Sequence, residues 1–250
     1  MVAGRSAISA TVTHRRYTVR VKRQFDPDEP ELMDRPQPVS PELDRDLNNL
    51  YQLNRFFGSH RLVIHFLRRW MTPGVQIRIA DLATGFGDIP RLAIDYARSI
   101  GSVVSVDAID QNAATLEIAK RASAAYPEIS FKSANILEWE PDQPCDIVLC
   151  SLALHHFTEA DAVRLLQRCV QHSRRFVLVS DLRRGYLASV GVFLLTATIF
   201  RDPMTRTDGR LSAARAFSFN EMGSLAEKAG WKNFGHARFR FARQAIWLGE

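Results

Sequence analysis

The segment of residues 77–90 constrains the fold more than any other part of the chain, because it predicts a strand, a tight turn and a helix in immediate succession. The strand is indicated by a β-branched run: Val75, Ile77 and Ile79. Gly85 and Gly87 then supply the permissive backbone that a sharp turn needs. Asp88 suits the N-cap of the following helix, and Pro90 suits its first turn. In an open α/β sheet, ligands bind at the carboxyl end of such a strand, so we expect a binding site here.

Asp81 falls where this strand ends, and the turn after it is compatible with more than one ligand. A dinucleotide fingerprint requires G-x-G-x-x-G/A, but its third position is Pro90 here. A P-loop is excluded because no Gly-Lys-Ser/Thr follows. An ordinary strand-to-helix turn that binds nothing is the simplest alternative.

The composition is that of a soluble protein with one large core. The chain has 250 residues and a net charge of +6, and its basic residues are scattered rather than gathered on one helix. This distribution gives little support for nucleic-acid binding. The three cysteines lie in apolar segments without metal-ligand spacing: Cys145, Cys150 and Cys169. We expect buried free thiols in a reducing compartment, and therefore a cytoplasmic protein.

Residues 1–40 are expected to form an N-terminal extension and a linker outside the main domain. Residues 1–23 are basic and lack the central apolar run of a secretory signal. Within them, residues 11–21 form either a strand or part of an irregular terminus. Residues 26–38 are acidic and rich in proline, which predicts an extended linker.

The main domain, residues 41–250, alternates between helical and strand patterns. It opens with helical spacing over residues 41–57 and 60–70, which forms either a lid over a ligand or a packing layer on the sheet. After the segment that carries the glycine turn, further strands are predicted at residues 103–107, 129–133, 145–150 and 176–180. Alternation at this spacing predicts a parallel sheet with helices on both faces.

The last part of the chain departs from the strand–helix alternation that predicts parallel strands. A capping box at Ser218 and Glu221 opens the last helix, and two strand patterns follow, over residues 231–241 and 244–248. The link between these strands is too short for a parallel crossover, so they form an antiparallel hairpin. The predicted fold is α/β: a three-layer α–β–α sandwich with a mostly parallel seven-stranded sheet and a C-terminal antiparallel hairpin.

Residues 183–217 are expected to be an insertion between the fifth strand and the last helix. Residues 186–200 are almost wholly apolar but too short to span a bilayer, which takes about 20 residues. They form a wall of the substrate pocket, a core helix or an interfacial helix, so peripheral membrane contact stays open. The polar residues 201–210 predict a loop. An insertion at this point lies over the carboxyl edge of the sheet, where a substrate arrives.

Asp110 lies just past the second strand of the main domain. A carboxylate at this place can accept both hydroxyls of an adenosyl ribose through its two oxygens. Capping of the next helix is the alternative role for Asp110, and Asp107 is the neighbouring acid with which it can be confused.

Taken together, four parts of the chain resemble the small-molecule branch of class I S-adenosylmethionine (SAM) methyltransferases: residues 81–87, Asp110, Asn135 and residues 151–157. The pattern D-x-A-x-G-x-G is similar to motif I of that family, with Ala83 where the family has its first glycine. The Leu-His-His-Phe run is similar to that of the quinone-biosynthesis methyltransferases. Residues 181–184, the apolar segment and residues 203–206 also resemble methyltransferases found beside type III polyketide synthases, which methylate phenolic lipids.

This resemblance implies SAM as the cofactor and assigns its contacts. The methionyl part lies against the glycine turn and the acid before it: Asp81, Ala83, Thr84, Gly85 and Gly87. Asp110 holds the ribose, with Gln111 beside it. Asn135, where the family often has Asp, lines the adenine together with Ile136, and a plain turn residue is the alternative for Asn135. Two residues border the transferable methyl group: Ser151 and Leu152.

The catalytic candidates are His155 and His156, because a phenol oxygen benefits from losing its proton and imidazole titrates near neutrality. Packing or helix capping is the alternative for one or both of them, and Asp181 or Tyr186 can play the same part. The transfer is an in-line displacement at a sulfonium methyl, which needs mainly alignment and a dry pocket. No metal is implied, because nothing resembles a paired-carboxylate site.

The expected function is a SAM-dependent methyltransferase of secondary metabolism, acting on a small, largely apolar acceptor by O-methylation of a phenolic or polyketide-type compound. An NAD-dependent dehydrogenase and a catalytically inactive SAM-binding protein are the alternatives. An RNA methyltransferase requires a basic aromatic platform, and none stands out. We expect neither a nucleic-acid partner nor a transmembrane segment, and the oligomeric state is left open.

Overall fold

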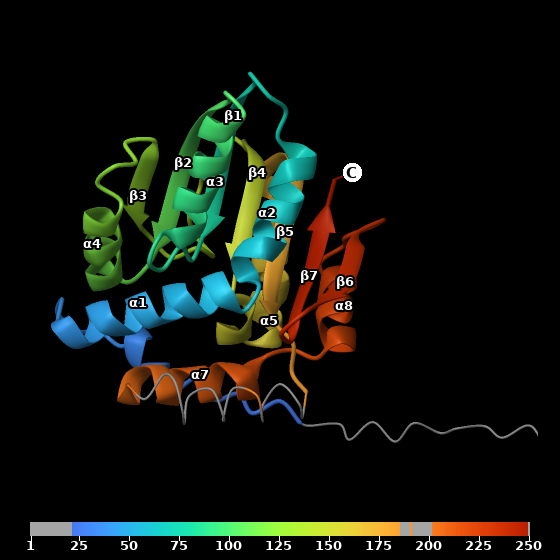
Figure 1. Ribbon diagram of the computed structural model, residues 1–250. Helices are drawn as coiled ribbons and strands as arrows, with labels where there is room; N and C mark the ends of the chain where they lie inside the picture. Colours follow the sequence, from blue (N-terminus) through green and yellow to red (C-terminus); the bar gives the residue numbers. More distant parts are fainter. Residues whose placement is uncertain (1–21, 186–190, 192–201, 250) are drawn as a thin grey trace, which may run out of the picture.

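The computed structural model describes residues 22–185, 191 and 202–249 (Figure 1). Seven strands form one sheet: β1 (Gln76–Leu82), β2 (Val103–Asp110), β3 (Ile129–Ser133), β4 (Cys145–Ser151), β5 (Ser173–Leu182), β6 (Gly235–Phe239) and β7 (Arg243–Leu248). Their order is β3-β2-β1-β4-β5-β7-β6. β1 to β5 run parallel, and β7 is antiparallel to both β5 and β6. The predicted fold class is confirmed.

Helices cover both faces of this sheet (Figure 1). On one face lie α2 (Ser59–Trp70) and α3 (Asp88–Ser99), and on the other lie α5 (Glu159–His172) and α8 (Phe219–Lys228). The period of two along a strand explains how one strand serves both layers. On β1, Ile79 packs with the α2 and α3 layer, and its neighbour Ala80 packs with the α5 and α8 layer. The remaining helix of the sandwich, α4 (Ala113–Ala122), lies against β2 and β3.

Two further helices, α1 (Pro41–Phe56) and α7 (Pro203–Arg215), run across the carboxyl end of the parallel strands (Figure 1). α1 begins as its sequence predicts, because the Ser40 side chain accepts a hydrogen bond from the backbone of Leu43 and Pro41 occupies the first position. α1 therefore has the position of a lid. α2, the second helix expected before the sheet, has the position of a packing layer.

The prediction of a loop over residues 201–210 is wrong, because this stretch enters helix α7. Asp202 caps the helix by accepting from the backbone N–H groups of Met204 and Thr205, and Pro203 stands at its first position. This is a standard helix start, which the polar composition concealed. The helix is held by buried polar contacts rather than by an apolar stripe, since Thr205 and Asp208 are among its few buried residues.

The prediction of an extended linker over residues 26–38 is also wrong. This segment contains the 3₁₀ turn η1 (Leu32–Asp34) and packs against α7. Asp208 of α7 accepts hydrogen bonds from the backbone of Leu32 and Met33 at 2.8 and 3.0 Å. Glu31 is buried and accepts from the hydroxyl of Ser212 at 2.7 Å. Contacts between residues far apart in the chain therefore order a segment whose composition suggested solvation.

Asp88 does not cap α3, contrary to the prediction. The N-cap is Gly87, whose φ of 70° places it in the left-handed region, and no side chain caps the helix. Asp88 lies in the first turn and binds Nε2 of His60 through its Oδ2 atom at 2.6 Å. It therefore connects α3 to α2. Pro90 occupies the first helical turn, as predicted.

The C-terminal hairpin is confirmed, with boundaries that differ from the prediction. β6 ends at Phe239 and β7 begins at Arg243, so the turn lies over residues 240–242. Phe241 and Ala242 are both left-handed there, with φ of 56° and 53°. This backbone is the one that short hairpin turns require, although neither residue is the glycine or asparagine that favours it.

The prediction for the cysteines is confirmed, whereas two predicted segments lie largely outside the described residues. All three cysteines are free and buried, as predicted. The proposed strand over residues 11–21 lies outside the described residues, and so does the apolar segment 186–200 except for Gly191. In the part of the chain that the structure describes, every helix falls short of the length and apolarity needed to cross a membrane.

Candidate active site

A cavity of about 780 Å³ lies at the carboxyl edge of the sheet, between the ends of the central strands and the helices α1 and α7. Most of the predicted site residues line it: Asp81, Ala83, Thr84, Gly85, Asp110, Gln111, Ile136, Ser151, Leu152, His155 and His156. Gly87 and Asn135 do not line it. The parallel topology explains this gathering, because it brings the carboxyl ends of β1, β2 and β4 to one edge.

The turn after β1 alternates between ordinary and left-handed backbone. Ala83, Gly85 and Gly87 have φ of 58°, 52° and 70°. At Gly85 a Cβ would meet nothing within 4 Å, whereas at Gly87 it would come within 3.2 Å of the Phe131 ring. Gly85 therefore keeps the cavity side of the turn open, and Gly87 allows close packing on β3. Ala83 adopts the same backbone despite its side chain, which costs about 1–2 kcal/mol.

Asp81, at the end of β1, is fully enclosed, and its Oδ2 atom has no hydrogen-bond partner among the described residues. Burial, with smaller contributions from Asp88 and Asp110, outweighs the effect of Thr84 and raises the pKa of Asp81 to about 8. A buried carboxylate without a partner is costly, so it favours a cation beside it. Such an environment suits a cationic group, and the resemblance places the methionyl part of SAM, which carries an ammonium, against Asp81.

Asp110 connects the turn to the end of β2. Its Oδ2 atom accepts a hydrogen bond from the backbone of Gly85, and its Oδ1 atom accepts one from the backbone of Asn112, both at 2.9 Å. Burial raises the pKa of Asp110. Each oxygen keeps a second lone pair, so the fixed carboxylate can still accept two ribose hydroxyls. The alternative role as N-cap belongs to Asn112 instead.

Asp107, the acid that can be confused with Asp110, has a different role, because both of its carboxylate oxygens are engaged in ion pairs. Its two oxygens form ion pairs with Arg78 and Lys132, at 2.8 and 2.9 Å. Asp107 is not among the residues that line the cavity. Its side chain therefore holds neighbouring strands together and is not a candidate for the ribose.

Asn135 and Ile136 lie in the turn after β3 and differ in position. Ile136 is buried and lines the cavity. Asn135 is exposed, and its Oδ1 atom accepts the backbone N–H of Leu137 at 3.0 Å. This arrangement is that of a turn residue, the alternative that its sequence left open.

Ser151 is the last residue of β4 and Leu152 follows it, and both line the cavity. The backbone N–H of Leu152 donates to the carbonyl of Ser180 at 2.8 Å, and its φ of 57° is left-handed. A bulky residue rarely adopts this backbone, which persists only where its surroundings impose it, and such strain concentrates at functional sites. Here it turns the chain from the end of β4 into the 3₁₀ turn η2 (Leu154–His156).

His155 is buried and held at both its backbone and its ring by Asp181, at the end of β5. The ring Nδ1 atom lies 2.7 Å from Oδ1 of Asp181, and the backbone N–H donates to Oδ2 at 2.8 Å. The other ring atom, Nε2, has no hydrogen bond within the described residues. It faces Oε1 of Glu31 at 3.6 Å.

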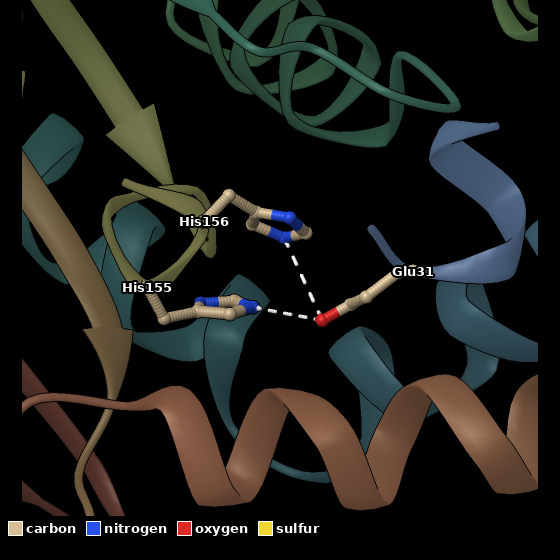
Figure 2. Close-up of side chains that lie close together, drawn as sticks. All are labelled: Glu31, His155 and His156. Carbon is tan, nitrogen blue, oxygen red and sulfur yellow. Dashed lines mark ion pairs between the residues drawn. The ribbon is translucent and has the colours of Figure 1, made fainter. Parts of the chain in front are cut away.

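His156 faces the same carboxylate oxygen, and its ring lies beside that of His155 (Figure 2). Its Nε2 atom lies 3.9 Å from Oε1 of Glu31, and its Nδ1 atom lies 2.9 Å from Asp34. Figure 2 shows the two imidazoles converging on Glu31. The two rings are tilted against each other, with centroids 4.2 Å apart. We refer to Glu31, His155 and His156 as the histidine–glutamate cluster.

The groups of this cluster shift one another's pKa. Burial alone would raise the pKa of Glu31, but the two imidazoles and the Ser212 hydroxyl outweigh it and lower the pKa to about 2. Burial would lower the pKa of His155, but Asp181 and Glu31 outweigh it and raise the pKa to about 10. Burial and His155 would lower the pKa of His156, but Glu31 and Asp34 prevail and raise it.

Sequence reasoning missed Glu31 and Asp34, which line the cavity from the segment expected to be a linker. It also missed Arg23, whose guanidinium donates to the carbonyls of His155 and Phe157 at 3.0 and 2.8 Å. The nearest signal was the concentration of acids in residues 26–38, but nothing local indicated which acid is buried. The N-terminal segment is thus part of the site.

Residues 79–175 match a family model described as a methyltransferase domain. This match confirms the predicted enzyme class, a SAM-dependent methyltransferase, and with it the predicted cofactor. A comparison with curated protein sequences finds no match. The narrower resemblances, to quinone-biosynthesis enzymes and to enzymes beside polyketide synthases, stay predictions.

Several solved structures share the fold. The plantazolicin methyltransferase BpumL, in complex with S-adenosylhomocysteine (SAH), has a TM-score of 0.61 at 11% identity, over 84% of this chain and 91% of that one. Human N-acetylserotonin methyltransferase in complex with SAM has a TM-score of 0.58 at 17% identity, over 83% of this chain and 55% of that one. A protein from Bordetella parapertussis described as a possible exported protein has a TM-score of 0.58 at 18% identity, over 76% of this chain and 66% of that one. At these identities the likeness shows the fold alone.

Proposed function

We propose that this methyltransferase moves the methyl group of SAM to an oxygen of a small, largely apolar acceptor of the phenolic or polyketide type. The observation that carries the proposal is the composition of the cavity at the carboxyl edge of the sheet. Apolar side chains dominate its walls, and its polar groups include those of the nucleotide-binding turn and of the histidine–glutamate cluster. Its volume of about 780 Å³ lies in the upper part of the usual range for small-molecule sites.

The cofactor is proposed to lie over the ends of β1 and β2. Asp81 binds the ammonium of the methionyl part, because its buried Oδ2 atom lacks a partner among the described residues. Asp110 binds the ribose through the lone pairs that its two backbone donors leave free. Ile136 supplies an apolar surface for the adenine, and Ser151 and Leu152 adjoin the methyl group.

The acceptor is proposed to lie over β4, β5 and β7, where the cavity continues beyond the cofactor. Its apolar walls there include Leu50, Phe57, Phe157 and Phe241, and Arg183 and Arg243 also line this part. These residues come from separate elements, α1, the η2 turn and the β6–β7 turn, so the shape of the pocket depends on tertiary packing. A flat, apolar ring system suits such walls, and the polar cluster suits one oxygen on it.

The reaction requires alignment more than it requires a reactive side chain. The acceptor oxygen forms a bond to the methyl carbon while the carbon–sulfur bond breaks, and that bond's electron pair stays on sulfur. SAM supplies the activated methyl group when it is bound. The histidine–glutamate cluster is the polar group available to the acceptor hydroxyl. A role for His155 or His156 as the proton acceptor stays a prediction, and Tyr186 lies outside the described residues.

The dehydrogenase alternative is disfavoured by the topology. The strand beside β5 is β7, which is antiparallel, whereas a classic dinucleotide fold continues with parallel strands. Neighbours with the same fold include enzymes that act on small molecules, plantazolicin and N-acetylserotonin by their names, which supports the small-acceptor class. An inactive SAM-binding protein is distinguished only by turnover. We also propose a cytoplasmic location, on the basis of the three buried free thiols.

The test is methyl transfer from SAM labelled in its methyl group. The purified chain is incubated with a panel of apolar phenols, with matched anilines and carboxylic acids as controls, and products are identified by mass and by NMR. We expect labelled methyl ethers from at least one phenol and release of SAH in equal amount. Cofactor binding without transfer to any acceptor would indicate the inactive binding protein, and label found on nitrogen would contradict O-methylation.

A further inference from the structure

We propose that Glu31, His155 and His156 bind one divalent transition-metal ion of the Zn²⁺ class. This revises the expectation from the sequence that no metal is involved. The three side chains come from the N-terminal segment and from the η2 turn, so the site exists only in the folded chain. Two imidazoles and one carboxylate, with further positions left open, form a ligand set typical of catalytic zinc sites.

The distances between the ligand atoms suit one ion. One ligand atom from each of the three residues lies within 4.8 Å of the other two. Oε1 of Glu31 is 3.6 Å from Nε2 of His155 and 3.9 Å from Nε2 of His156. Bonds of about 2.0–2.2 Å to a tetrahedral ion place its ligand atoms about 3–3.5 Å apart. Small side-chain rotations therefore close the cluster around a metal.

The Nε2 atom of His155, which is buried without a hydrogen bond among the described residues, is an independent sign of a missing ligand. Only 3% of the His155 side chain is exposed. The opposite ring atom, Nδ1, is held by Asp181, which fixes the ring so that Nε2 points at Glu31. A buried polar atom without a partner is costly, and a metal at this point satisfies it.

The two histidines are supported by neighbouring carboxylates in the way that metal-binding histidines commonly are. Both imidazoles present Nε2 to the cluster and bind a carboxylate through Nδ1: Asp181 for His155, and Asp34 for His156. Ligating histidines characteristically donate their second N–H to such a carboxylate, which fixes the ring and strengthens the ligand.

This site deepens the proposed function and rests on it only for its role in the reaction. The cluster lines the same cavity as the cofactor-binding turn, so an open coordination position can take the acceptor oxygen. A metal-bound hydroxyl has a lowered pKa and gives its proton to water. Its oxygen then bonds to the methyl carbon, the carbon–sulfur bond breaks, and the electron pair of that bond stays on sulfur.

The binding test needs neither SAM nor an acceptor. The purified full-length chain is freed of metal with a chelator and titrated with Zn²⁺ by calorimetry, and Co²⁺ is added separately to read the visible spectrum of the bound ion. We expect one Zn²⁺ per chain and the intense absorption of low-coordinate Co²⁺. Glu31→Gln and His156→Gln should each weaken Zn²⁺ binding at least tenfold. The matched controls Glu42→Gln and His65→Gln change exposed residues and should bind like the parent chain.

Several outcomes separate the two proposals. Absence of stoichiometric Zn²⁺ and Co²⁺ binding by the parent chain overturns the metal site, whatever the variants do. Equal binding by Glu31→Gln, shown to be folded by its circular dichroism, overturns it as well. Methyl transfer at full rate by the chelated chain overturns the role of the metal but leaves the methyltransferase proposal intact. One bound Zn²⁺ without methyl transfer to any acceptor supports the site and contradicts the proposed function.

Discussion

Asp181 holds His155 with both oxygens of its carboxylate, one on the ring Nδ1 atom at 2.7 Å and the other on the backbone N–H at 2.8 Å. The two residues are far apart in the chain and meet because β4 and β5 are neighbours in the sheet. The register pairs Ser151, the last residue of β4, with Ser180, so Asp181 lies one residue beyond the level at which β4 ends. A carboxylate on a strand therefore fixes the ring of a histidine that lies in the η2 turn.

Asp181→Asn should leave the His155 ring less firmly positioned and should not change cofactor binding. The amide cannot supply the charge that holds Nδ1, so we expect Zn²⁺ affinity to fall about 10–100-fold while SAH affinity stays within a factor of two or so. Calorimetry with each ligand measures both. Asp95→Asn, at an exposed position, is the control. Unchanged Zn²⁺ affinity in folded Asp181→Asn would mean that Asp181 has no part in positioning a ligand.

Asp110→Asn should weaken SAH binding by about 1–3 kcal/mol, because hydrogen bonds from the ribose to a charged oxygen are lost and the turn loses a strong acceptor for the Gly85 N–H. The affinity is measured by calorimetry at fixed ionic strength. Asp142→Asn, on an exposed loop, removes the same charge far from the cavity and should leave the affinity unchanged. If the two variants bind SAH equally well, the ribose contact lies elsewhere.

Cofactor binding should strengthen as pH rises from about 6 to about 7.5, a range in which the amino group of SAH remains protonated. In the empty site, burial raises the pKa of Asp81 to about 8, so the carboxyl is mostly neutral below that pH. A cationic ligand favours the ionised form, so the affinity rises as the proton leaves, by up to tenfold per pH unit. Asp81→Asn should show a much flatter profile. An affinity that falls with rising pH would contradict this contact.

Asp46→Asn should stabilise the protein at high pH. Burial raises the pKa of Asp46 to about 6, with further contributions from neighbouring acids, and it is fully enclosed. Because this folded-state pKa exceeds the unfolded value, the protonated form favours folding, and stability is lost as pH rises through about 6. The cost above that pH is of the order of 2–3 kcal/mol.

Thermal unfolding at two pH values tests this sign. The gain in melting temperature of Asp46→Asn over the parent chain should be larger at pH 8 than at pH 4.5. Asp28→Asn changes an exposed carboxylate and should show no such difference. A gain that is equal at both pH values would place the effect in packing rather than in ionisation.

The fold was largely predictable because its signals are local. The β-branched run before Asp81, the capping residues Ser40 and Ser218 and the short link in the hairpin each act within a few residues. The position of Asp110 followed from the general rule for parallel sheets. The start of α7 at Asp202 and Pro203 is an equally local signal, but the polar composition of the stretch also predicts a loop.

The site was predictable only in part, because its second half depends on long-range contacts. Burial of Glu31 requires α7 beneath it, and no pattern within residues 26–38 distinguishes it from the exposed acids nearby. Asn135 is the opposite example, a predicted binding residue whose side-chain oxygen instead accepts a hydrogen bond from the backbone of Leu137 in the same turn. Asp88 lost its capping role to a glycine and gained a partner in His60, which only the packing of α2 on α3 could reveal.

The central claim is that one cavity holds SAM over β1 and β2 and an acceptor beside the histidine–glutamate cluster. A crystal structure of the full chain with SAH tests it most directly. We expect the ribose hydroxyls on Asp110, the amino group on Asp81, and the sulfur atom facing the side of the cavity that carries Glu31, His155 and His156. A sulfur atom facing away from that cluster, or SAH bound outside the cavity, would contradict the account.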